Sequence, residues 1–288
     1  MAQVRAGTLL AGYSLGVAWK EIAELDPTRA IIPPGTRVNI GFRDDSDLAM
    51  RVSTARAIKR SGFAPEAVIA ARRLLSERML REYLSALREA GASESVLVVG
   101  GDPEPPRGPY PDAASVIASG LLEEHGVREA SVAGHPGGHP AVADGVLWPA
   151  LAGKTAALGR RGLRGGVVTQ FGFDAARVLA WLADARTRGI SVPVWVGVPG
   201  PAGVRQLLSY ASRCGVAVSA PVAREYGFSL TDLTATAGPD RFIRALAAGY
   251  DPRLHGEVRL HFNTFSGFAA TAEWISRFRQ AVPASGTV

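Results

Sequence analysis

Short apolar runs alternate with amphipathic stretches along most of the chain, and Gly, Pro, Asn or Asp stands at most of the boundaries. Apolar runs between turn residues predict buried strands, whereas apolar residues three and four positions apart predict helices. The predicted strands cover residues 12–17, 36–42, 67–71, 95–99, 130–133, 166–169, 192–198 and 258–262. The predicted helices cover residues 18–25, a segment ending near 60, and residues 77–90, 112–124, 146–158, 174–188, 203–214, 230–236, 240–248 and 269–282.

Eight strands separated mostly by helices are what a parallel barrel requires. The pattern therefore predicts the α/β class and a (β/α)8 TIM barrel, with residues 1–288 as a single domain. Two domains remain an alternative at this length. Asp44, Asp45 and Ser46 are candidate caps for the helix that ends near residue 60, and Asp174 is a candidate N-cap after the sixth strand.

Charge narrows the classes of partner. Hydrophobic residues make up 47% of the 288 positions, and the formal net charge is +6. The positive charge is spread over the helices, with Arg beside Glu or Asp, and aromatic residues do not interleave with a basic cluster, so nucleic acid is a minor hypothesis. A basic protein also suits an anionic small molecule, such as a nucleotide phosphate or a polyglutamate tail.

Cysteine content and hydropathy bear on the compartment. Cys214 is the single cysteine, which excludes an intramolecular disulfide and a cysteine-based zinc site. No apolar run reaches the length that a bilayer requires, and no segment resembles a signal peptide. We therefore expect a soluble cytoplasmic protein with no membrane partner, and a homo-oligomer remains open.

Polar residues at the ends of predicted strands are the candidates for chemistry, because barrel sites are assembled from those ends. They are Asp102, His135, His139, Gln170, His261 and Asn263. The Asp102 carboxylate can accept hydrogen bonds from the amide and amine edge of a heterocycle, and the Gln170 amide can both donate and accept. The alternatives are a turn aspartate before proline, an ordinary polar loop residue at position 170, and a His261 that caps the final strand.

His135 and His139 lie on a loop rich in Gly and Pro, directly after an apolar run. A metal pair is disfavoured, because the two histidines do not share a helix face and no nearby acid supplies a third ligand. Neutral imidazoles beside a planar cofactor fit better, while loop histidines bonded to backbone are the alternative. Lys154, on the next helix, could reach a phosphate or could lie on a solvated face.

Several segments form an ordered set along the chain. Four of them are Gly101-Asp102-Pro, Ala133-Gly-His-Pro-Gly-Gly-His-Pro, Val168-Thr-Gln-Phe-Gly-Phe-Asp and Val192-Pro-Val-Trp-Val-Gly-Val-Pro-Gly. In order and spacing they resemble the strand-end motifs of methylenetetrahydrofolate reductases. Tyr13-Ser-Leu, Pro34-Gly-Thr-Arg-Val and Ala71-Arg-Arg-Leu are similar to the short, single-domain bacterial branch of that family. The resemblance covers nearly the whole chain and independently implies the barrel.

In that family a flavin, usually FAD, takes hydride from NAD(P)H and passes it to the methylene carbon of a tetrahydrofolate derivative. The resemblance implies that Asp102 and Gln170 are the catalytic and substrate-binding residues, with Asp102 near flavin and pterin and Gln170 against the pterin. It also implies that Gly101, Asp102, His135, His139 and Lys154 bind the cofactor, the lysine near its phosphates.

The chain departs from the family at several positions where flavin and folate should meet. Gly16 stands where the family has the glutamate that serves as general acid, and loss of such a group typically costs about a hundredfold to ten-thousandfold in rate. Larger residues are also expected at Gly100, Gly137 and Gly172, and a histidine at Val68. We expect Glu21 and Glu24, on the following helix, to be too far away to substitute for the missing acid.

Two functions follow from these matches and departures. The first is a methylenetetrahydrofolate reductase-like barrel that binds a reduced folate, in which flavin-dependent hydride transfer is impaired by Gly16. The alternative is a diverged, flavin-free homologue that acts as a non-redox folate-dependent one-carbon enzyme or as a folate-binding protein.

Overall fold

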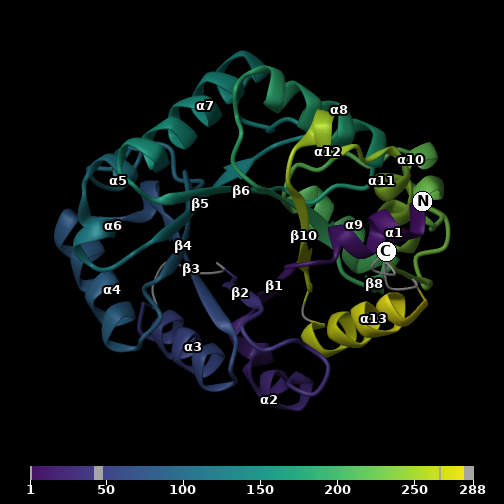
Figure 1. Ribbon diagram of the computed structural model, residues 1–288, viewed down its shortest axis with the longest axis horizontal. Helices are drawn as coiled ribbons and strands as arrows, with labels where there is room; N and C mark the ends of the chain where they lie inside the picture. The colour runs from purple at the N-terminus through teal and green to yellow at the C-terminus, as the bar shows by residue number, and fades with distance from the viewer. Residues whose placement is uncertain (1, 42–47, 266, 282–288) are drawn as a thin grey trace.

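Eight parallel strands close into a barrel in the computed structural model, which describes residues 2–41, 48–265 and 267–281 (Figure 1). The strands are β1 (Ser14–Val17), β2 (Arg37–Ile40), β3 (Ala64–Ala70), β4 (Ser95–Val99), β5 (Glu129–Gly134), β6 (Arg164–Thr169), β7 (Val194–Pro199) and β10 (Val258–Asn263). Their order around the barrel is β1-β10-β7-β6-β5-β4-β3-β2, so the last strand pairs with the first. The predicted (β/α)8 TIM barrel is confirmed.

Helices surround the barrel on its outer side (Figure 1). The α-helices are α1 (Ala2–Leu9), α2 (Leu25–Thr28), α3 (Leu48–Arg60), α4 (Glu77–Glu89), α5 (Ala113–Ala118), α6 (Leu121–Glu124), α7 (Asp144–Arg160), α8 (Ala175–Thr187), α9 (Val204–Arg213), α10 (Ala220–Tyr226), α11 (Asp240–Gly249), α12 (Pro252–His255) and α13 (Phe268–Ala281). Two 3₁₀ helices, η1 (Trp19–Glu24) and η2 (Ala71–Arg73), follow β1 and β3. A two-stranded antiparallel sheet of β8 (Ala202–Gly203) and β9 (Thr236–Ala237) braces the segment between β7 and β10.

Several helix predictions are corrected by local hydrogen bonding. The predicted helix over 230–236 does not form, because Asp232 Oδ1 accepts the backbone N–H groups of Thr234 and Ala235 and offers the chain an alternative to helical pairing. The predicted helix over 112–124 is divided at Gly120, whose φ of 81° is left-handed. The first strand begins at Ser14 rather than at residue 12.

Two predicted helix starts have different outcomes. Asp174 is the N-cap of α8 as predicted, since its carboxylate accepts the N–H of Arg177 at 2.9 Å. The proposed caps Asp44, Asp45 and Ser46 lie outside the residues that the structure describes.

Side chains alternate between the helical layer and the barrel interior along each strand. In β3, Ala67 and Ile69 belong to the large core that the strands share with the helices. Val68 belongs instead to a smaller apolar cluster inside the barrel with Leu97, Val168 and Trp195. The position at which the family resemblance expects a histidine therefore contributes packing to the barrel interior.

Membrane insertion was tested on the described part of the chain. No helix there combines the length and the apolar content that crossing a bilayer requires.

Candidate functional site

Asp102 lies just beyond β4, at the C-terminal ends of the strands, which we call the mouth of the barrel. Its side chain is 90% exposed, and Arg73 donates a hydrogen bond to Oδ2 at 3.0 Å. Gly101 precedes it with a left-handed φ of 88°, a conformation that favours glycine. The Asp102 carboxylate is thus presented to solvent from a tight turn and retains capacity to accept further hydrogen bonds.

Gln170 follows β6 directly and is half-buried. Its backbone N–H donates to the carbonyl oxygen of Gly134 at 2.8 Å, which holds it beside the end of β5. Its side-chain Oε1 accepts the backbone N–H of Phe171 at 3.1 Å. The amide oxygen is therefore occupied, and the amide NH₂ is the group that Gln170 can offer to a ligand.

His135 and His139 meet on the loop after β5, with ring centroids 5.0 Å apart and an interplanar angle of 88°. Burial lowers the pKa of His135 to about 4, and the neighbouring His139 and Lys154 lower it further. His135 is consequently neutral near pH 7. His139 Nδ1 accepts the backbone N–H of Ala141 at 3.2 Å, so this ring is used in part to shape the loop.

Lys154 reaches back from α7 toward β5 and donates to the carbonyl oxygen of Ala133 at 3.2 Å. Burial lowers the pKa of Lys154. It shares a cavity of about 240 Å³ with His135, Arg177 and the rings of Trp148 and Trp181. Arg177 closes the loop side of this cavity through its bonds to the carbonyl oxygens of the Pro136-Gly pair.

Four glycines stand where the family resemblance expects larger side chains: Gly16, Gly100, Gly137 and Gly172. None of them has a left-handed φ. A Cβ atom at Gly100, Gly137 or Gly172 would meet nothing within 4 Å, and one at Gly16 would lie 3.6 Å from the carbonyl oxygen of Phe262. Neither backbone conformation nor close packing requires glycine at these positions, so they leave open space.

The two carboxylates that follow β1 are bound to backbone. Glu21 is 3% exposed, and its oxygens accept the N–H groups of Ala18 at 2.6 Å and Phe268 at 2.8 Å. Glu24 accepts the N–H of Ala269 at 2.7 Å. Both side chains therefore cap the N-terminus of α13, and neither is free to donate a proton to a ligand in place of a residue at Gly16.

His261, expected at a strand end, lies inside the barrel instead. It is 5% exposed, and its Nδ1 is 2.8 Å from Ser14 Oγ across the junction of β10 and β1. Burial lowers the pKa of His261 to about 4, with a smaller contribution from Arg37. Asn263 does end its strand, and its carbonyl oxygen accepts the N–H of Gly200 at 2.8 Å.

Within the described ranges, no group of three or more His, Cys, Asp and Glu side chains is placed to hold a metal ion. Cys214 is half-buried at the end of α9. Burial raises the pKa of its thiol, and the carboxylate of Asp102 adds to that effect. The end of α9 therefore lies close to the β4 loop that carries Asp102.

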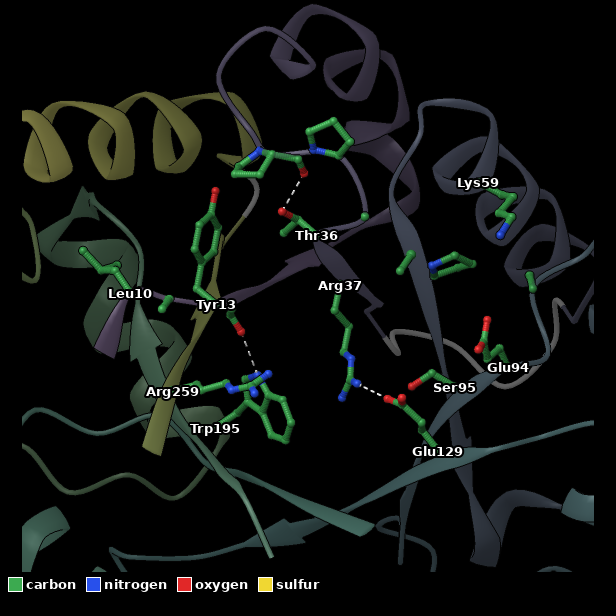
Figure 2. A pocket seen from close by; sticks show the side chains of 18 of the residues that line it. Leu10, Tyr13, Thr36, Arg37, Lys59, Glu94, Ser95, Glu129, Trp195 and Arg259 are labelled. Atoms are coloured by element: carbon green, nitrogen blue, oxygen red, sulfur yellow. Dashed lines mark hydrogen bonds and ion pairs between the residues drawn. The ribbon is translucent and has the colours of Figure 1, made fainter. Parts of the chain in front are cut away.

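A second cavity, of about 460 Å³, lies at the opposite pole of the barrel, where the strands begin (Figure 2). We call it the basal cavity. Figure 2 shows Tyr13, Trp195 and Arg259 on one side of it, with Arg37 extending between them and Glu129. Sequence reasoning did not anticipate it, because the search for functional residues was confined to the strand ends at the mouth.

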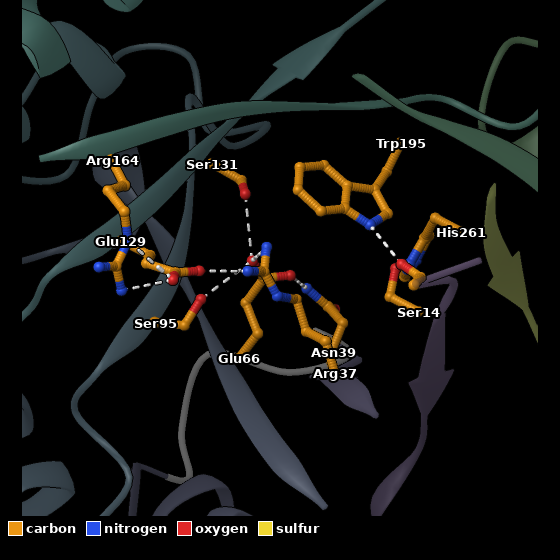
Figure 3. Close-up of polar contacts among 11 residues, drawn as sticks. Ser14, Arg37, Asn39, Glu66, Ser95, Glu129, Ser131, Arg164, Trp195 and His261 are labelled. Carbon is orange, nitrogen blue, oxygen red and sulfur yellow. Dashed lines mark hydrogen bonds and ion pairs between the residues drawn. The ribbon is translucent and has the colours of Figure 1, made fainter. Parts of the chain in front are cut away.

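The barrel interior next to this cavity holds a network centred on Glu66 (Figure 3). Glu66 is completely buried. Its Oε1 accepts from Arg37 at 3.3 Å, Ser95 at 3.3 Å and Ser131 at 3.1 Å, and its Oε2 accepts from Asn39 at 3.2 Å. The buried charge is thus both paired and hydrogen-bonded, as burial of a carboxylate requires.

A second set of charges surrounds the network at its basal side. Glu129 binds Arg37 and also Arg164, the latter at 2.6 Å. The guanidinium carbons of Arg37 and Arg259 lie 4.7 Å and 5.1 Å from the ring centroid of Trp195. Polar residues at alternate positions, such as Arg37 and Asn39 in β2, were the sequence signal for this interior, since alternate residues face the same side of a strand.

No family model matches the chain. Two solved structures resemble it. One is an uncharacterized protein from Clostridium thermocellum described as binding two copies of 5-methyl-5,6,7,8-tetrahydrofolic acid, with a TM-score of 0.63 and 8% identity over 94% of both chains. The other is the 3-dehydroquinate dehydratase from Aquifex aeolicus VF5, with a TM-score of 0.48 and 10% identity over 95% of this chain and 99% of that one. The first likeness shows that the barrel fold is shared.

Proposed function

We propose that this barrel binds a reduced folate at its mouth, against Asp102 and Gln170. The observation that carries the proposal is the likeness, over 94% of both chains, to a barrel described as binding 5-methyl-5,6,7,8-tetrahydrofolic acid. The strand-end motifs that resemble methylenetetrahydrofolate reductases support it independently, because they lie on the same loops of this fold. A distant relationship to that family is part of the proposal.

The contacts of the two residues suit a pterin. Asp102 is exposed and bound to Arg73 through one oxygen, so its other oxygen can accept N–H groups from the amine and amide edge of the heterocycle. Gln170 has its oxygen committed to Phe171, so its NH₂ group would donate to a pterin carbonyl or ring nitrogen. The two side chains would orient the ligand, and Gly16, Gly100 and Gly172 would leave room for it.

Efficient reduction of the bound folate is not part of the leading proposal. Gly16 has no proton to give, and the nearby Glu21 and Glu24 carboxylates are bound to backbone N–H groups of α13. The residues expected to hold FAD also fit it poorly. Lys154 is turned to the carbonyl oxygen of Ala133, in a cavity of about 240 Å³, below the roughly 300–1,000 Å³ of typical ligand pockets. The function favoured is therefore folate binding, or a non-redox folate-dependent one-carbon reaction.

Flavin-dependent hydride transfer from NAD(P)H to methylene-tetrahydrofolate is the second candidate. One observation favours it. His135 is an uncharged imidazole packed beside His139, and Lys154 stands behind both, which is the side-chain set that the resemblance assigns to FAD. Purified protein that gains bound-flavin absorbance when mixed with FAD would favour this candidate, and a protein that never retains flavin would remove it.

Calorimetric titration with 5-methyltetrahydrofolate tests the leading proposal. We expect saturable binding, and we expect Asp102→Asn to weaken it by about tenfold or more, because a charge-assisted hydrogen bond contributes about 1.5–3 kcal/mol. Glu104→Gln is the matched control. Glu104 is an exposed carboxylate on the same loop, bound to Arg72 at 2.5 Å as Asp102 is bound to Arg73. No heat of binding, or equal losses in the two variants, would contradict the proposal.

Gly16→Glu separates binding from reduction. The added side chain meets no close contact at its Cβ, so the variant should fold. If Gly16 is simply a lost acid, the variant should gain folate reduction when FAD and NADH are supplied, and Gly16→Gln should not. A folded Gly16→Glu variant that binds folate and stays inactive would indicate that the mouth serves another reaction or binding alone.

A further inference from the structure

The basal cavity is distinct from the site proposed above, since it opens at the opposite pole of the barrel. Its volume of about 460 Å³ lies within the roughly 300–1,000 Å³ of small-molecule sites. It is formed where β2, β4, β5, β7 and β10 begin, together with the loop segments 10–13 and 33–36. Residues on strands, rather than on long loops, therefore supply most of its polar groups.

Positive side chains outnumber negative ones in the lining. Arg37, Lys59, Arg259 and Arg279 face two carboxylates, those of residues 94 and 129, which leaves an excess of two positive charges. Arg37 is already paired with Glu66 and with the carboxylate of residue 129, and Arg259 is paired with Glu257 at 2.5 Å. Lys59 and Arg279 form no ion pair within the described residues.

Helix capping accounts for only part of this arrangement. Lys59 lies in the last turn of α3 and Arg279 in the last turn of α13, where a cation interacts favourably with the C-terminal end of the helix dipole. Arg37 and Arg259 lie on β2 and β10, so a helix end does not explain them. Their common feature is the indole of Trp195, whose ring centroid lies within 5.1 Å of each guanidinium carbon.

Trp195 and Arg259 are held as a unit. The two residues are register partners in the parallel pair of β7 and β10, and the indole Nε1 donates to the carbonyl oxygen of Gly12 at 3.2 Å. Tyr13 adds a second aromatic ring to the lining. Burial raises its pKa to about 12, so the phenol is neutral at physiological pH. Aromatic and guanidinium planes of this kind stack on a flat ring.

We propose that the basal cavity binds an aromatic molecule that carries two negative charges. Its ring packs against Trp195 and the guanidinium groups of Arg37 and Arg259, and its anionic groups reach Lys59 and Arg279. Arginine forks bind carboxylate and phosphate oxygens alike, so an aryl dicarboxylate and an aryl phosphate share the required chemistry. The Glu66 network keeps Arg37 in place behind the ligand.

Calorimetric titration at low salt, with small probes, tests the proposal on the full chain. Isophthalate and phenyl phosphate represent the two sources of charge, isophthalamide keeps the ring without the charge, and inorganic phosphate keeps the charge without the ring. We expect at least one of the two aryl anions to bind with a Kd below about 1 mM, and we expect the amide and inorganic phosphate to bind at least tenfold more weakly. Equal binding of inorganic phosphate, or binding of neither aryl anion, would overturn the proposal.

Matched variants locate the site. Arg259→Gln should weaken binding of the aryl anion by about tenfold or more, and Arg279→Gln by about threefold or more. Arg277→Gln is the control for Arg279→Gln, because Arg277 lies on the same helix, is exposed and pairs with Glu273 away from the cavity. Arg60→Gln serves in the same way for Lys59→Gln. Equal losses in a variant and its control would refer the effect to net charge alone and overturn the proposed site.

The mouth provides the remaining control. Asp102→Asn should leave binding of the aryl anion unchanged, because Asp102 lies beyond the C-terminal end of β4 whereas the cavity lies at the opposite end of the strands. Failure of folate binding at the mouth would not affect this result. If Asp102→Asn abolished binding of the aryl anion, the probe would be occupying the mouth, and the basal site would be wrong.

Discussion

The carboxylate of Glu21 accepts the backbone N–H of Phe268 at 2.8 Å, although the two residues are 247 positions apart. The same carboxylate accepts the N–H of Ala18 at 2.6 Å. One buried side chain therefore joins the loop after the first strand to the start of α13. This bond also consumes the acid closest in sequence to Gly16, and it ties the closure of the barrel to the chemistry available at its mouth.

Replacing Glu21 should destabilise the fold more than it affects any ligand. Glu21→Gln removes the charge that strengthens two hydrogen bonds to buried N–H groups, so we expect a loss of about 1–3 kcal/mol in the free energy of unfolding, measured in urea. Glu24→Gln is the matched control, because Glu24 accepts one N–H, that of Ala269, and should lose about 1 kcal/mol or less. A Glu21→Gln protein as stable as the wild type would contradict this role.

The buried His261 should make stability depend on pH. Its pKa is lowered to about 4 from an ordinary value of 6.5, so the unfolded chain takes up a proton below pH 6.5 that the folded chain does not. Stability is therefore fully present above pH 6.5 and is lost as the pH falls toward 4, by about 1.4 kcal/mol per pH unit from this residue.

Denaturation series between pH 6 and 4.5 measure that slope. His261→Gln should reduce the slope by about 1.4 kcal/mol per pH unit. Ser14→Ala removes the hydrogen-bond partner of His261 and should lower stability while keeping the slope. An unchanged slope in His261→Gln would mean that other groups carry the acid sensitivity.

Glu66 should be the most costly carboxylate to neutralise in the barrel. It is completely buried and accepts four hydrogen bonds, so Glu66→Gln leaves the charge of Arg37 without one of its partners. We expect about 3–5 kcal/mol of destabilisation, the range for a broken buried pair. Glu104→Gln removes an exposed partner of Arg72 and should cost about 0–1 kcal/mol. Similar losses in the two variants would contradict a central role for Glu66.

Glycines inside the barrel and at its mouth should respond oppositely to alanine. A Cβ at Gly197 would lie 2.5 Å from the carbonyl oxygen of Thr169, which is backbone and has no room to move aside. Gly197→Ala should therefore cost about 1–3 kcal/mol in thermal or urea unfolding. Gly172→Ala faces open space at an ordinary φ and should be neutral or stabilising by up to about 1 kcal/mol, because alanine restricts the unfolded chain. Marked destabilisation by Gly172→Ala would show that the mouth needs its glycines for structure.

The barrel itself could be predicted from the sequence, because each strand is a short apolar run that ends in turn residues. The prediction was weakest where polar side chains bind nearby backbone. Residues 230–236 have helical spacing, but Asp232 captures the N–H groups that a helix would use. The apolar spacing near residue 8 belongs to the end of α1 rather than to a strand, since a short apolar run does not distinguish the two structures.

The site was predicted less evenly than the fold. His135 and Lys154 share one cavity, and Asp102 and Gln170 stand at the mouth, because position in a βα loop follows from the strand that precedes it. The actual partners of these residues could not be predicted. The bonds from Lys154 to Ala133 and from Arg73 to Asp102 depend on how separate helices and loops pack, and local spacing contains no information on that packing. The interior charges were missed for the same reason.

The pairing of β10 with both β1 and β7 also constrains how the chain can fold during synthesis. Ribosomes produce β1 through β7 well before residues 258–263, so until then the nascent chain has two open strand edges and a Trp195 without its partner Arg259. Such edges are templates for pairing with other chains. The nascent protein is therefore most exposed to aggregation in the interval before β10 emerges, and chaperone binding would protect it most in that interval.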